Sequence, residues 1–277
     1  MIVSHRPALP LRPYVRYYYG LTCAMDGVEQ LQPVPARSPQ IIEFMFGTPY
    51  RVQRLNLGIT EDAHPVTLVG AKTHRHVNLL LTGKVDAFTV AFEPAGFVSL
   101  FSVPAEDLTD ADLDARSALG RTMDDLWQRL AEAGSFGSRV AVADAFFSGH
   151  CPDFLVPSAI RQAARIMHGY DGSLRIDKLA QRLDISTRQF QRRFRYEIGI
   201  TPRLYARVVR FEAALRQKAV APQMLWTDIA HSLGYFDQMH MIHDFRQLSG
   251  DTPTGISDHL DMFVRPEVEL KIAHLNT

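Results

Sequence analysis

The sequence of 277 residues lacks any apolar run long enough to cross a membrane, because a spanning helix needs about 18–20 consecutive apolar residues. Residues 1–7 also lack the charged and then apolar pattern of a secretion signal, so we expect a cytoplasmic protein with no membrane partner. Only two cysteines occur, Cys23 and Cys151, and they lie far apart in the sequence. This scarcity excludes a disulfide scaffold and a thiolate-rich zinc site, and it predicts two reduced thiols.

Sequence signatures of catalysis are missing as well. The chain has no Gly-x-Ser-x-Gly nucleophile turn, no glycine-rich phosphate loop and no His-Glu-x-x-His zinc-protease motif. We therefore expect a protein that is not an enzyme and uses no cofactor. With 46% hydrophobic and 22% charged residues, the chain is typical of a globular protein with room for two domains.

Net charge is also absent over the whole chain, but the charges are unevenly spread. Residues 1–154 hold 13 Lys and Arg against 17 Asp and Glu, whereas residues 155–250 hold 15 against 8. A neutral chain with a basic block near its C-terminus favours an acidic partner that touches only that block.

The two ends of the chain differ in their hydrophobic pattern. Short apolar runs between glycines and prolines predict strands at 41–46, 67–69, 77–81 and 87–92, which favour a compact antiparallel β-barrel. Cap residues and helical spacing predict two or three helices over 105–150, and helical spacing continues from Pro157 almost to the end. The sequence therefore predicts an α+β protein of two domains. An N-terminal β-barrel with helices spans 1–150, and after a linker near 148–153 an all-α domain spans 155–265.

A duplicated unit is the strongest signal in the last hundred residues. Three pairs of anchors repeat at a spacing of 50 or 51 residues: Leu179-Ala180-x-x-Leu183 with Ile229-Ala230-x-x-Leu233, Phe190-x-x-x-Phe194 with Met241-x-x-x-Phe245, and Gly199-Ile-Thr-Pro202 with Gly250-Asp-Thr-Pro253. Each copy reads as a short helix, a tight turn, a second helix and a glycine stop, which is helix-turn-helix organisation. An amphipathic helix expected over about residues 204–215 would hold the two units against successive major grooves of DNA.

In the first copy, Ser186 is expected to cap a helix that buries Phe190 and Phe194. The opposite face of this helix carries a stripe of arginine and glutamine, whose donors match the edges of guanine and adenine in a major groove. The residues predicted to bind DNA in this unit are Ser186, Thr187, Arg188, Gln191, Arg192 and Arg195. The alternative is a solvated basic helix face, and the duplication argues against it.

In the second copy, Asp237 is the expected cap, and Met241 and Phe245 are expected to face inward. The residues predicted to bind DNA here are Gln238, Met239, His240 and His243. This face is less basic and partly apolar, so it suits thymine methyl groups and phosphates better than direct recognition of bases. Ordinary surface histidines remain an equal alternative for His240 and His243.

Residues 160–257 resemble the DNA-binding domain of the AraC/XylS family of transcription regulators. The resemblance rests on Leu179-Ala180, Ser186, Phe190, Arg192-x-Phe194, Gly199-x-x-Pro202, Tyr205, Arg210, Ile229-Ala230, Gly234-Tyr235, Phe245 and Gly250-Asp-Thr-Pro253. It implies a sequence-specific regulator that binds double-stranded DNA. The base-reading positions that it implies are Arg188, Gln191 and Arg192 in the first unit and Gln238, Met239, His240 and His243 in the second. The second unit departs from the family pattern at Phe236, where a small polar or acidic residue is usual.

The N-terminal half resembles the N-terminal domains attached to this family, through Phe92-Glu-Pro-Ala-Gly-Phe97, Leu100-Phe101 and Pro104-Ala-Glu-Asp-Leu108. In the wider family such domains form a cupin-like barrel that senses an effector, mediates dimerisation, or does both. We expect a small-molecule effector in a pocket lined by Tyr18, Phe44 and Phe46, with barrel core as the alternative for these aromatic residues.

Two protein partners are also expected. The apolar stripe of Met123, Leu126, Trp127 and Leu130 predicts a homodimer through residues 105–150, and the alternative is that the stripe covers the barrel. RNA polymerase is a further partner for a regulator of this kind.

Two other functions compete with a DNA-binding regulator. One is a metal-dependent cupin-type enzyme or sensor fused to a DNA-binding module, because His74 and His76 would face the same side of a strand, near His64. No glutamate follows His76 within five residues, where a cupin metal site usually supplies one, so we expect no metal and expect both histidines to be dispensable. The other is an interaction protein whose basic face contacts acidic proteins.

Overall fold

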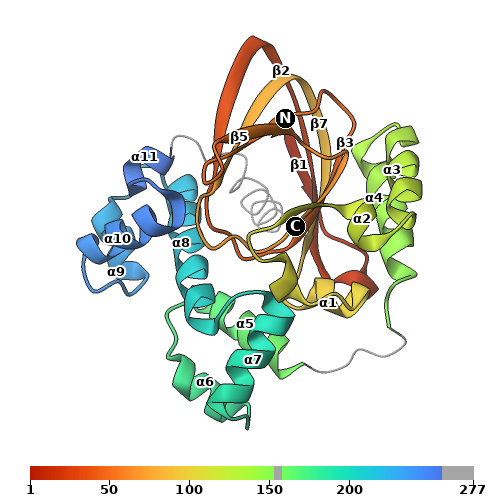
Figure 1. The fold of residues 1–277 in the computed structure, drawn as a ribbon. Coiled ribbons are helices and arrows are strands. Elements are labelled where there is room, and N and C mark those ends of the chain that lie inside the picture. The colour runs from red at the N-terminus through yellow and green to blue at the C-terminus, as the bar shows by residue number, and fades with distance from the viewer. Residues whose placement is uncertain (153–157, 258–277) are drawn as a thin grey trace.

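The computed structural model describes residues 1–152 and 158–257, in which a sheet-rich N-terminal part packs beside a helical C-terminal part (Figure 1). The strands are β1 (Ile2–His5), β2 (Val15–Val34), β3 (Ile41–Met45), β4 (Arg51–Arg54), β5 (Ile59–Asp62), β6 (Val66–Val69), β7 (Val77–Phe92) and β8 (Asp112–Asp114). The helices of the N-terminal part are η1 (Leu9–Leu11), α1 (Gly96–Phe101), η2 (Ala105–Leu108), α2 (Ala115–Leu119), α3 (Thr122–Glu132) and α4 (Phe136–Ser148).

The strands form one antiparallel sheet in the order β1-β2-β7-β3-β6-β8, and β4 pairs with both β5 and β7. This corrects the expected β-barrel, because β1 and β8 end the order and do not pair with each other in the described residues. The sheet instead folds over along β7, which pairs with β4 through its first residues and with β3 through its last. The expected α+β class, with the strands in the N-terminal part, is confirmed.

Two strands are longer than the sequence pattern indicates. Residues 77–81 and 87–92, expected as separate strands, both belong to β7, in which Gly83 has a φ of +61°. The paired strand β2 has 20 residues, and its register with β7 shifts between Met25 and Gln30. A glycine with positive φ and a register shift let the two strands bend together without leaving the sheet.

Helices α3 and α4 cover one face of the sheet, on the right in Figure 1. Met123, Leu126 and Leu130 are fully buried against this face, and the indole N–H of Trp127 donates to the carbonyl of Met45 at 2.8 Å. The apolar stripe that was expected to form a homodimer interface therefore packs inside the chain, where it forms part of the core between α3 and the sheet. The expectation that 105–150 holds two or three helices is confirmed by the three α-helices α2, α3 and α4, beside the short 3-10 helix η2.

The helices of the C-terminal part are α5 (Ala159–Gly169), α6 (Ile176–Arg182), α7 (Thr187–Ile198), α8 (Pro202–Val220), α9 (Trp226–Ser232), α10 (Gln238–Ser249) and α11 (Pro253–Ser257). The pairs α6–α7 and α9–α10 are the two copies of the duplicated unit, so the helix-turn-helix prediction is confirmed. Among the described residues, no helix is both long and apolar enough to span a membrane. Cys23 and Cys151 are both free thiols, as expected.

The two parts of the molecule share a hydrophobic core. Ala36, Ala71 and Ala95 of the N-terminal part lie in the same buried cluster as the helix-turn-helix residues. Across this junction, the Ser38 hydroxyl donates to the carboxylate of Glu212 at 2.9 Å. Residue 153 of the expected linker lies outside the described residues. The segments 155–157 and 258–265 of the expected DNA-binding domain lie outside them too.

Candidate DNA interface, effector cavity and histidine cluster

Helix α7 is the second helix of the first helix-turn-helix unit, and we call it the first reading helix. It begins at a capping box, in which Ser186 and Gln189 bind each other's backbone. The Ser186 hydroxyl accepts a hydrogen bond from the backbone N–H of Gln189 at 3.2 Å, and the Gln189 side chain accepts one from the Ser186 N–H. This capping box satisfies two donors that the helix leaves free at its N-terminus. Phe190 and Phe194 are fully buried with ring centroids 5.4 Å apart, so the inner face of α7 is held in the core.

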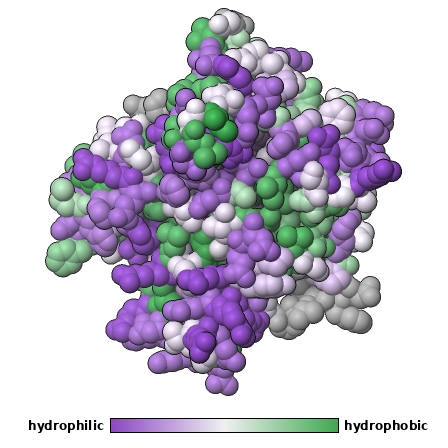
Figure 2. All heavy atoms as spheres, in the orientation of Figure 1, coloured by the Kyte–Doolittle hydropathy of each residue, from purple (hydrophilic) through white to green (hydrophobic). Residues whose placement is uncertain are grey.

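The outer face of α7 is open to a partner. All six residues predicted to bind DNA in this unit are exposed: Ser186, Thr187, Arg188, Gln191, Arg192 and Arg195. All of them except Thr187 line one groove, together with Gln189 and with Glu106 of the N-terminal part. The surface over α6 and α7 is almost wholly hydrophilic in Figure 2.

The arginines of the C-terminal part fall into two groups. Arg207 binds the carboxylate of the buried Asp244 at 2.7 Å, which ties α8 to α10. Within the described residues, Arg188, Arg192 and Arg195 form no ion pair. Three unpaired cations on one helix face produce a positive potential that attracts phosphates, whereas the paired arginine supports the fold.

The second reading helix, α10, begins at Asp237, whose carboxylate accepts a hydrogen bond from the N–H of His240 at 2.7 Å. The expected cap is confirmed, and Met241 and Phe245 are fully buried as expected. The four residues predicted to bind DNA in this unit are all exposed: Gln238, Met239, His240 and His243. The side chain of Met239 is 66% exposed and that of Phe236 is 92% exposed, which gives this unit an apolar outer surface.

Helix α8 joins the two units through a continuous aromatic core. The ring centroid of its Tyr205 lies 5.3 Å from that of Phe194 in α7, and the ring centroid of its Phe211 lies 4.7 Å from that of Phe245 in α10. The helix has 19 residues, which corresponds to about 28 Å of length. Because both reading helices pack directly on it, the spacing between them is set by one rigid element.

The N-terminal part lies against the end of α7, a contact that no local sequence pattern indicates. The Thr109 hydroxyl donates to the carbonyl of Gly199 at 2.6 Å, and the Gln40 amide donates to the carbonyl of Ile198 at 2.8 Å. Gly199 has a φ of +99°, and a Cβ there would lie 2.9 Å from the carbonyl oxygen of Ala105. This close contact brings η2, and with it Glu106, beside the reading helix.

A cavity of about 60 Å³ lies within the N-terminal part, on the side of the sheet away from α3 and α4. Its wall includes Tyr19, Ile41 and Glu43. The residues predicted to line an effector pocket, Tyr18, Phe44 and Phe46, do not line this cavity. Side chains alternate along β2 and β3, so these three lie under the helices on the opposite face.

The cavity contains buried polar groups. Burial raises the pKa of the Glu43 carboxyl group, although a hydrogen bond from the Tyr50 hydroxyl and the charge of Arg37 oppose this shift. Burial, with the charge of Glu43, also raises the pKa of Tyr19 to about 12. The Nε–H of Arg37 is buried and has no hydrogen-bond partner in the described structure. An unmet donor in a cavity wall is a position where a ligand acceptor would be favourable.

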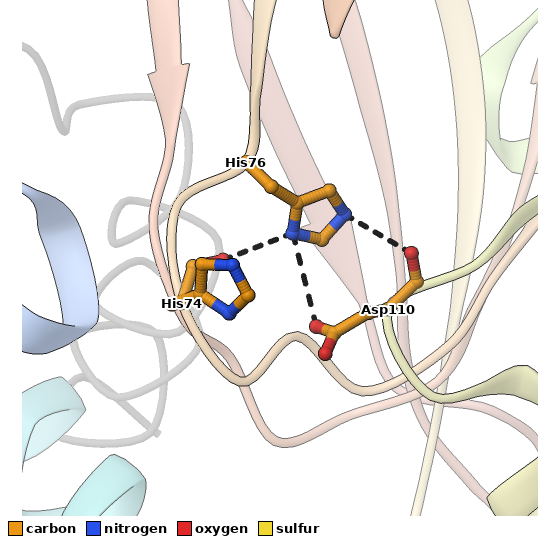
Figure 3. A group of neighbouring side chains, drawn as sticks. All are labelled: His74, His76 and Asp110. Carbon is orange, nitrogen blue, oxygen red and sulfur yellow. Dashed lines mark hydrogen bonds and ion pairs between the residues drawn. The ribbon is translucent and has the colours of Figure 1, made fainter. Parts of the chain in front are cut away.

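His74, His76 and Asp110 form a second polar cluster, at the junction of the two parts (Figure 3). One ligand atom from each residue lies within 4.8 Å of the others. His76 is buried, and burial together with the Lys72 charge lowers its pKa, so its ring is neutral near pH 7. The sequence next to the two histidines supplies no third ligand, and the folded chain brings one from the loop after η2.

The comparisons with known proteins agree with this geometry. Residues 179–258 match a family model described as a helix-turn-helix domain, which covers both α6–α7 and α9–α10. The chain is a DNA-binding transcription regulator with an AraC/XylS-type helix-turn-helix domain. Residues 3–114 of the regulator match a second model, described as a domain of unknown function, DUF6597.

Solved structures that share the fold of the regulator include those of ToxT from Vibrio cholerae. One has a TM-score of 0.54 and 9% identity, over 87% of this chain and 98% of that chain. Another, of ToxT bound to (E)-4-(8-methylnaphthalen-1-yl)but-3-enoic acid, has a TM-score of 0.52 and 8% identity over 88% of this chain and 99% of that chain. A third, of wild-type ToxT bound to an unsaturated fatty acid, has a TM-score of 0.51 and 10% identity over 87% and 94%. At these identities the likeness concerns the fold, and no curated protein matches the sequence.

Proposed function

We propose that the regulator recognises a specific duplex DNA sequence mainly through α7, with α10 as a second, less selective contact. The observation that carries the proposal is the set of three arginines on the outer face of α7, which are exposed and form no ion pair in the described residues. Arginine reads guanine by bidentate hydrogen bonds, and Gln191 beside them is suited to adenine. The apolar surface of Met239 on α10 suits thymine methyl groups.

In this proposal, residues 155–265 form the DNA-binding domain and residues 1–150 form a sensing domain. The regulator acts by binding and performs no catalytic step. The bound DNA lies against the helix-turn-helix units, and the N-terminal part adjusts their access to it.

Selection of bound sequences from random duplex DNA with the full-length chain tests the recognition proposal. We expect enrichment of one motif, and loss of specificity at one or two of its positions in Arg188→Ala and Arg192→Ala. Arg129→Ala, which removes an exposed arginine of α3, is the matched control and should give the wild-type motif. Recovery of unselected sequences by the wild-type chain would contradict sequence-specific recognition.

We further propose that a small polar molecule binds in the N-terminal cavity as an effector. The buried Nε–H of Arg37 supports this, because leaving such a donor unpaired costs about 1–3 kcal/mol. A carboxylate is a strong acceptor for this donor, and ToxT binds carboxylic acids in two of its structures. The cavity of about 60 Å³ has room for about five water-sized groups, so the effector is smaller than a fatty acid.

Thermal unfolding with a panel of small carboxylic acids and their amides tests the effector proposal. At least one acid should raise the Tm of the wild type and leave that of Arg37→Gln unchanged, whereas Arg129→Gln should respond as the wild type does. An equal shift in Arg37→Gln, or stabilisation only by long-chain fatty acids, would contradict this assignment of the cavity.

A homodimer, and contact with RNA polymerase, remain parts of the proposal. The dimer has to use a surface other than the Met123-Leu126-Leu130 stripe, which is buried against the sheet. Light scattering on the full chain at tens of micromolar distinguishes monomer from dimer.

A further inference from the structure

The cluster of His74, His76 and Asp110 joins two segments that are far apart in the sequence. The histidines lie in the loop between β6 and β7, and Asp110 follows η2, so only the folded chain brings the three together (Figure 3). Two imidazoles and one carboxylate form a donor set that zinc and related divalent metals prefer.

The hydrogen bonds of Thr73 leave one nitrogen of His74 free for a metal. The Thr73 hydroxyl donates its only proton to a carboxylate oxygen of Asp110 at 2.6 Å. The same hydroxyl lies 2.8 Å from Nδ1 of His74, so it must accept from that nitrogen. The proton therefore occupies Nδ1, and Nε2 of the exposed His74 ring keeps its lone pair.

Both ring nitrogens of His76 face oxygen acceptors, and a neutral ring carries one proton for the two. Its Nε2 lies 3.0 Å from the backbone carbonyl oxygen of Asp110. Its Nδ1 lies 3.2 Å from the carbonyl oxygen of His74 and 3.8 Å from a carboxylate oxygen of Asp110. In the tautomer with the proton on Nε2, which donates over the shorter distance, the Nδ1 lone pair points toward these oxygens, and a cation among them takes the place of a proton. A histidine held through its second nitrogen by a carbonyl is also the usual arrangement at metal sites.

Asp110 is held in place for the same role. Its backbone has a φ of +60°, a left-handed conformation that aspartate adopts more readily than most residues and that turns its side chain toward Thr73. The backbone N–H of Thr73 donates to its second carboxylate oxygen at 2.7 Å. A carboxylate has about four lone-pair positions, so these two bonds orient the group and leave an oxygen able to bind a metal.

The positive charge of Lys72 does not prevent a metal ion from binding at this cluster. The ammonium group of Lys72 lies 3.4 Å from Nε2 of His76, but it binds the carboxylate of Asp112 at 2.7 Å. That ion pair neutralises the nearest positive charge, on the side of the ring away from the three donor atoms.

We propose that His74 Nε2, His76 Nδ1 and a carboxylate oxygen of Asp110 bind one divalent transition metal ion of the Zn²⁺ type, with water in the fourth position. Tetrahedral zinc with bonds of about 2.0–2.1 Å places its ligands roughly 3.3 Å apart. One ligand atom from each of the three residues lies within 4.8 Å of the others, so binding requires the side chains to draw closer together, and the exposed His74 is free to move. The site stands independently of the DNA-binding proposal. It borders the helix-turn-helix part, because the Arg75 side chain between the two histidines lies beside Gly250 at the end of α10.

Titration of the metal-free full-length chain with Zn²⁺ and Ni²⁺, by calorimetry and by elemental analysis after dialysis, tests the proposal. We expect one equivalent of metal, a higher Tm with metal, and no binding of Mg²⁺. Asp110→Asn keeps the side-chain shape and tolerates the positive φ, and it should weaken Zn²⁺ binding at least about tenfold, as should His74→Ala. His5→Ala removes an exposed histidine of β1 and should bind Zn²⁺ as the wild type does. The absence of saturable binding by the wild type, or equal binding by folded His74→Ala and Asp110→Asn, would overturn the proposal.

Discussion

The side-chain partners of each arginine separate two roles within a single C-terminal part. Arg207 is paired with a carboxylate, and its contribution is to the packing of α8 against α10. Arg192 and Arg195 have no carboxylate partner in the described residues, so their charges are available to a ligand. If a paired arginine bound DNA, an existing ion pair would have to break. Binding of DNA by an unpaired arginine breaks none.

Two substitutions on α7 distinguish base recognition from phosphate contact. Arg192→Ala should weaken binding to the preferred site by about 1–3 kcal/mol and relax base preference at one position. Arg195→Ala, at the far end of the stripe, should weaken all sequences equally and reduce the salt slope of binding by about 1. Both are measured by fluorescence anisotropy on the selected site and on single-base variants at several salt concentrations. Uniform weakening of every sequence by Arg192→Ala would show that this residue does not read a base.

The buried carboxyl group of Glu43 makes the stability of the N-terminal part depend on pH. Its pKa is raised in the folded chain by burial, so folding favours the protonated form. The stability that protonated Glu43 contributes is complete below the ordinary glutamate pKa and is lost as pH rises through the raised pKa. Between pH 4.5 and pH 8, the free energy of unfolding should therefore fall less in Glu43→Gln than in the wild type, as measured by urea unfolding. Glu132→Gln, an exposed residue of α3, should keep the wild-type pH dependence, and an identical dependence in Glu43→Gln would contradict the assignment.

At the scale of single elements, the two reading helices share their construction but differ on their outer faces. Each starts at a side-chain cap, buries two large residues four positions apart, and ends at a glycine with positive φ, Gly199 or Gly250. The outer face of α7 carries arginines, whereas that of α10 carries Met239, His240 and His243. The two copies therefore keep the residues that fold each unit, while the residues on their exposed outer faces differ.

The cap of α10 provides a test at this scale. Asp237→Ala should lower the free energy of unfolding by about 1 kcal/mol, because the first-turn N–H of His240 loses its acceptor. Asp237→Asn retains a side-chain oxygen for this hydrogen bond and should remain close to the wild type. Chemical denaturation followed by circular dichroism measures both. Equal stability of the alanine and wild-type chains would show that the cap contributes nothing.

At the scale of the whole molecule, the N-terminal part contributes to the groove along α7. Glu106 of η2 lines the same groove as Arg188, Arg192 and Arg195. A carboxylate in this position opposes the approach of phosphates and competes for the arginines, so the position of η2 bears on DNA affinity.

Removing this carboxylate should strengthen DNA binding. Glu106→Gln should raise affinity for duplex DNA by roughly twofold to fivefold at low salt, the range expected for an exposed charge, and the gain should shrink as salt rises. Glu132→Gln removes an exposed carboxylate on the far side of the sheet and should have little effect. Unchanged or weaker binding by Glu106→Gln would indicate that η2 moves away before DNA binds.

Features that depend on neighbouring residues were accessible from the sequence. The duplicated helix-turn-helix units, the caps at Ser186 and Asp237 and the exposed stripe on α7 all arise from spacings of three to seven residues, which helical geometry converts directly into faces. The sequence by itself therefore determined the helix-turn-helix part and the face of α7 and of α10 that is exposed.

Features that depend on distant pairings were decided only by the tertiary structure. The open sheet in place of a barrel follows from which strands pair, and the positions of Tyr18 and Phe44 follow from strand register, which a local pattern does not specify. The meeting of His74 with Asp110, and of Glu106 with α7, joins segments separated by more than 30 residues. Hydrophobic periodicity shows which face of an element is buried, but not what it is buried against, because that choice is made by the packing of the whole chain.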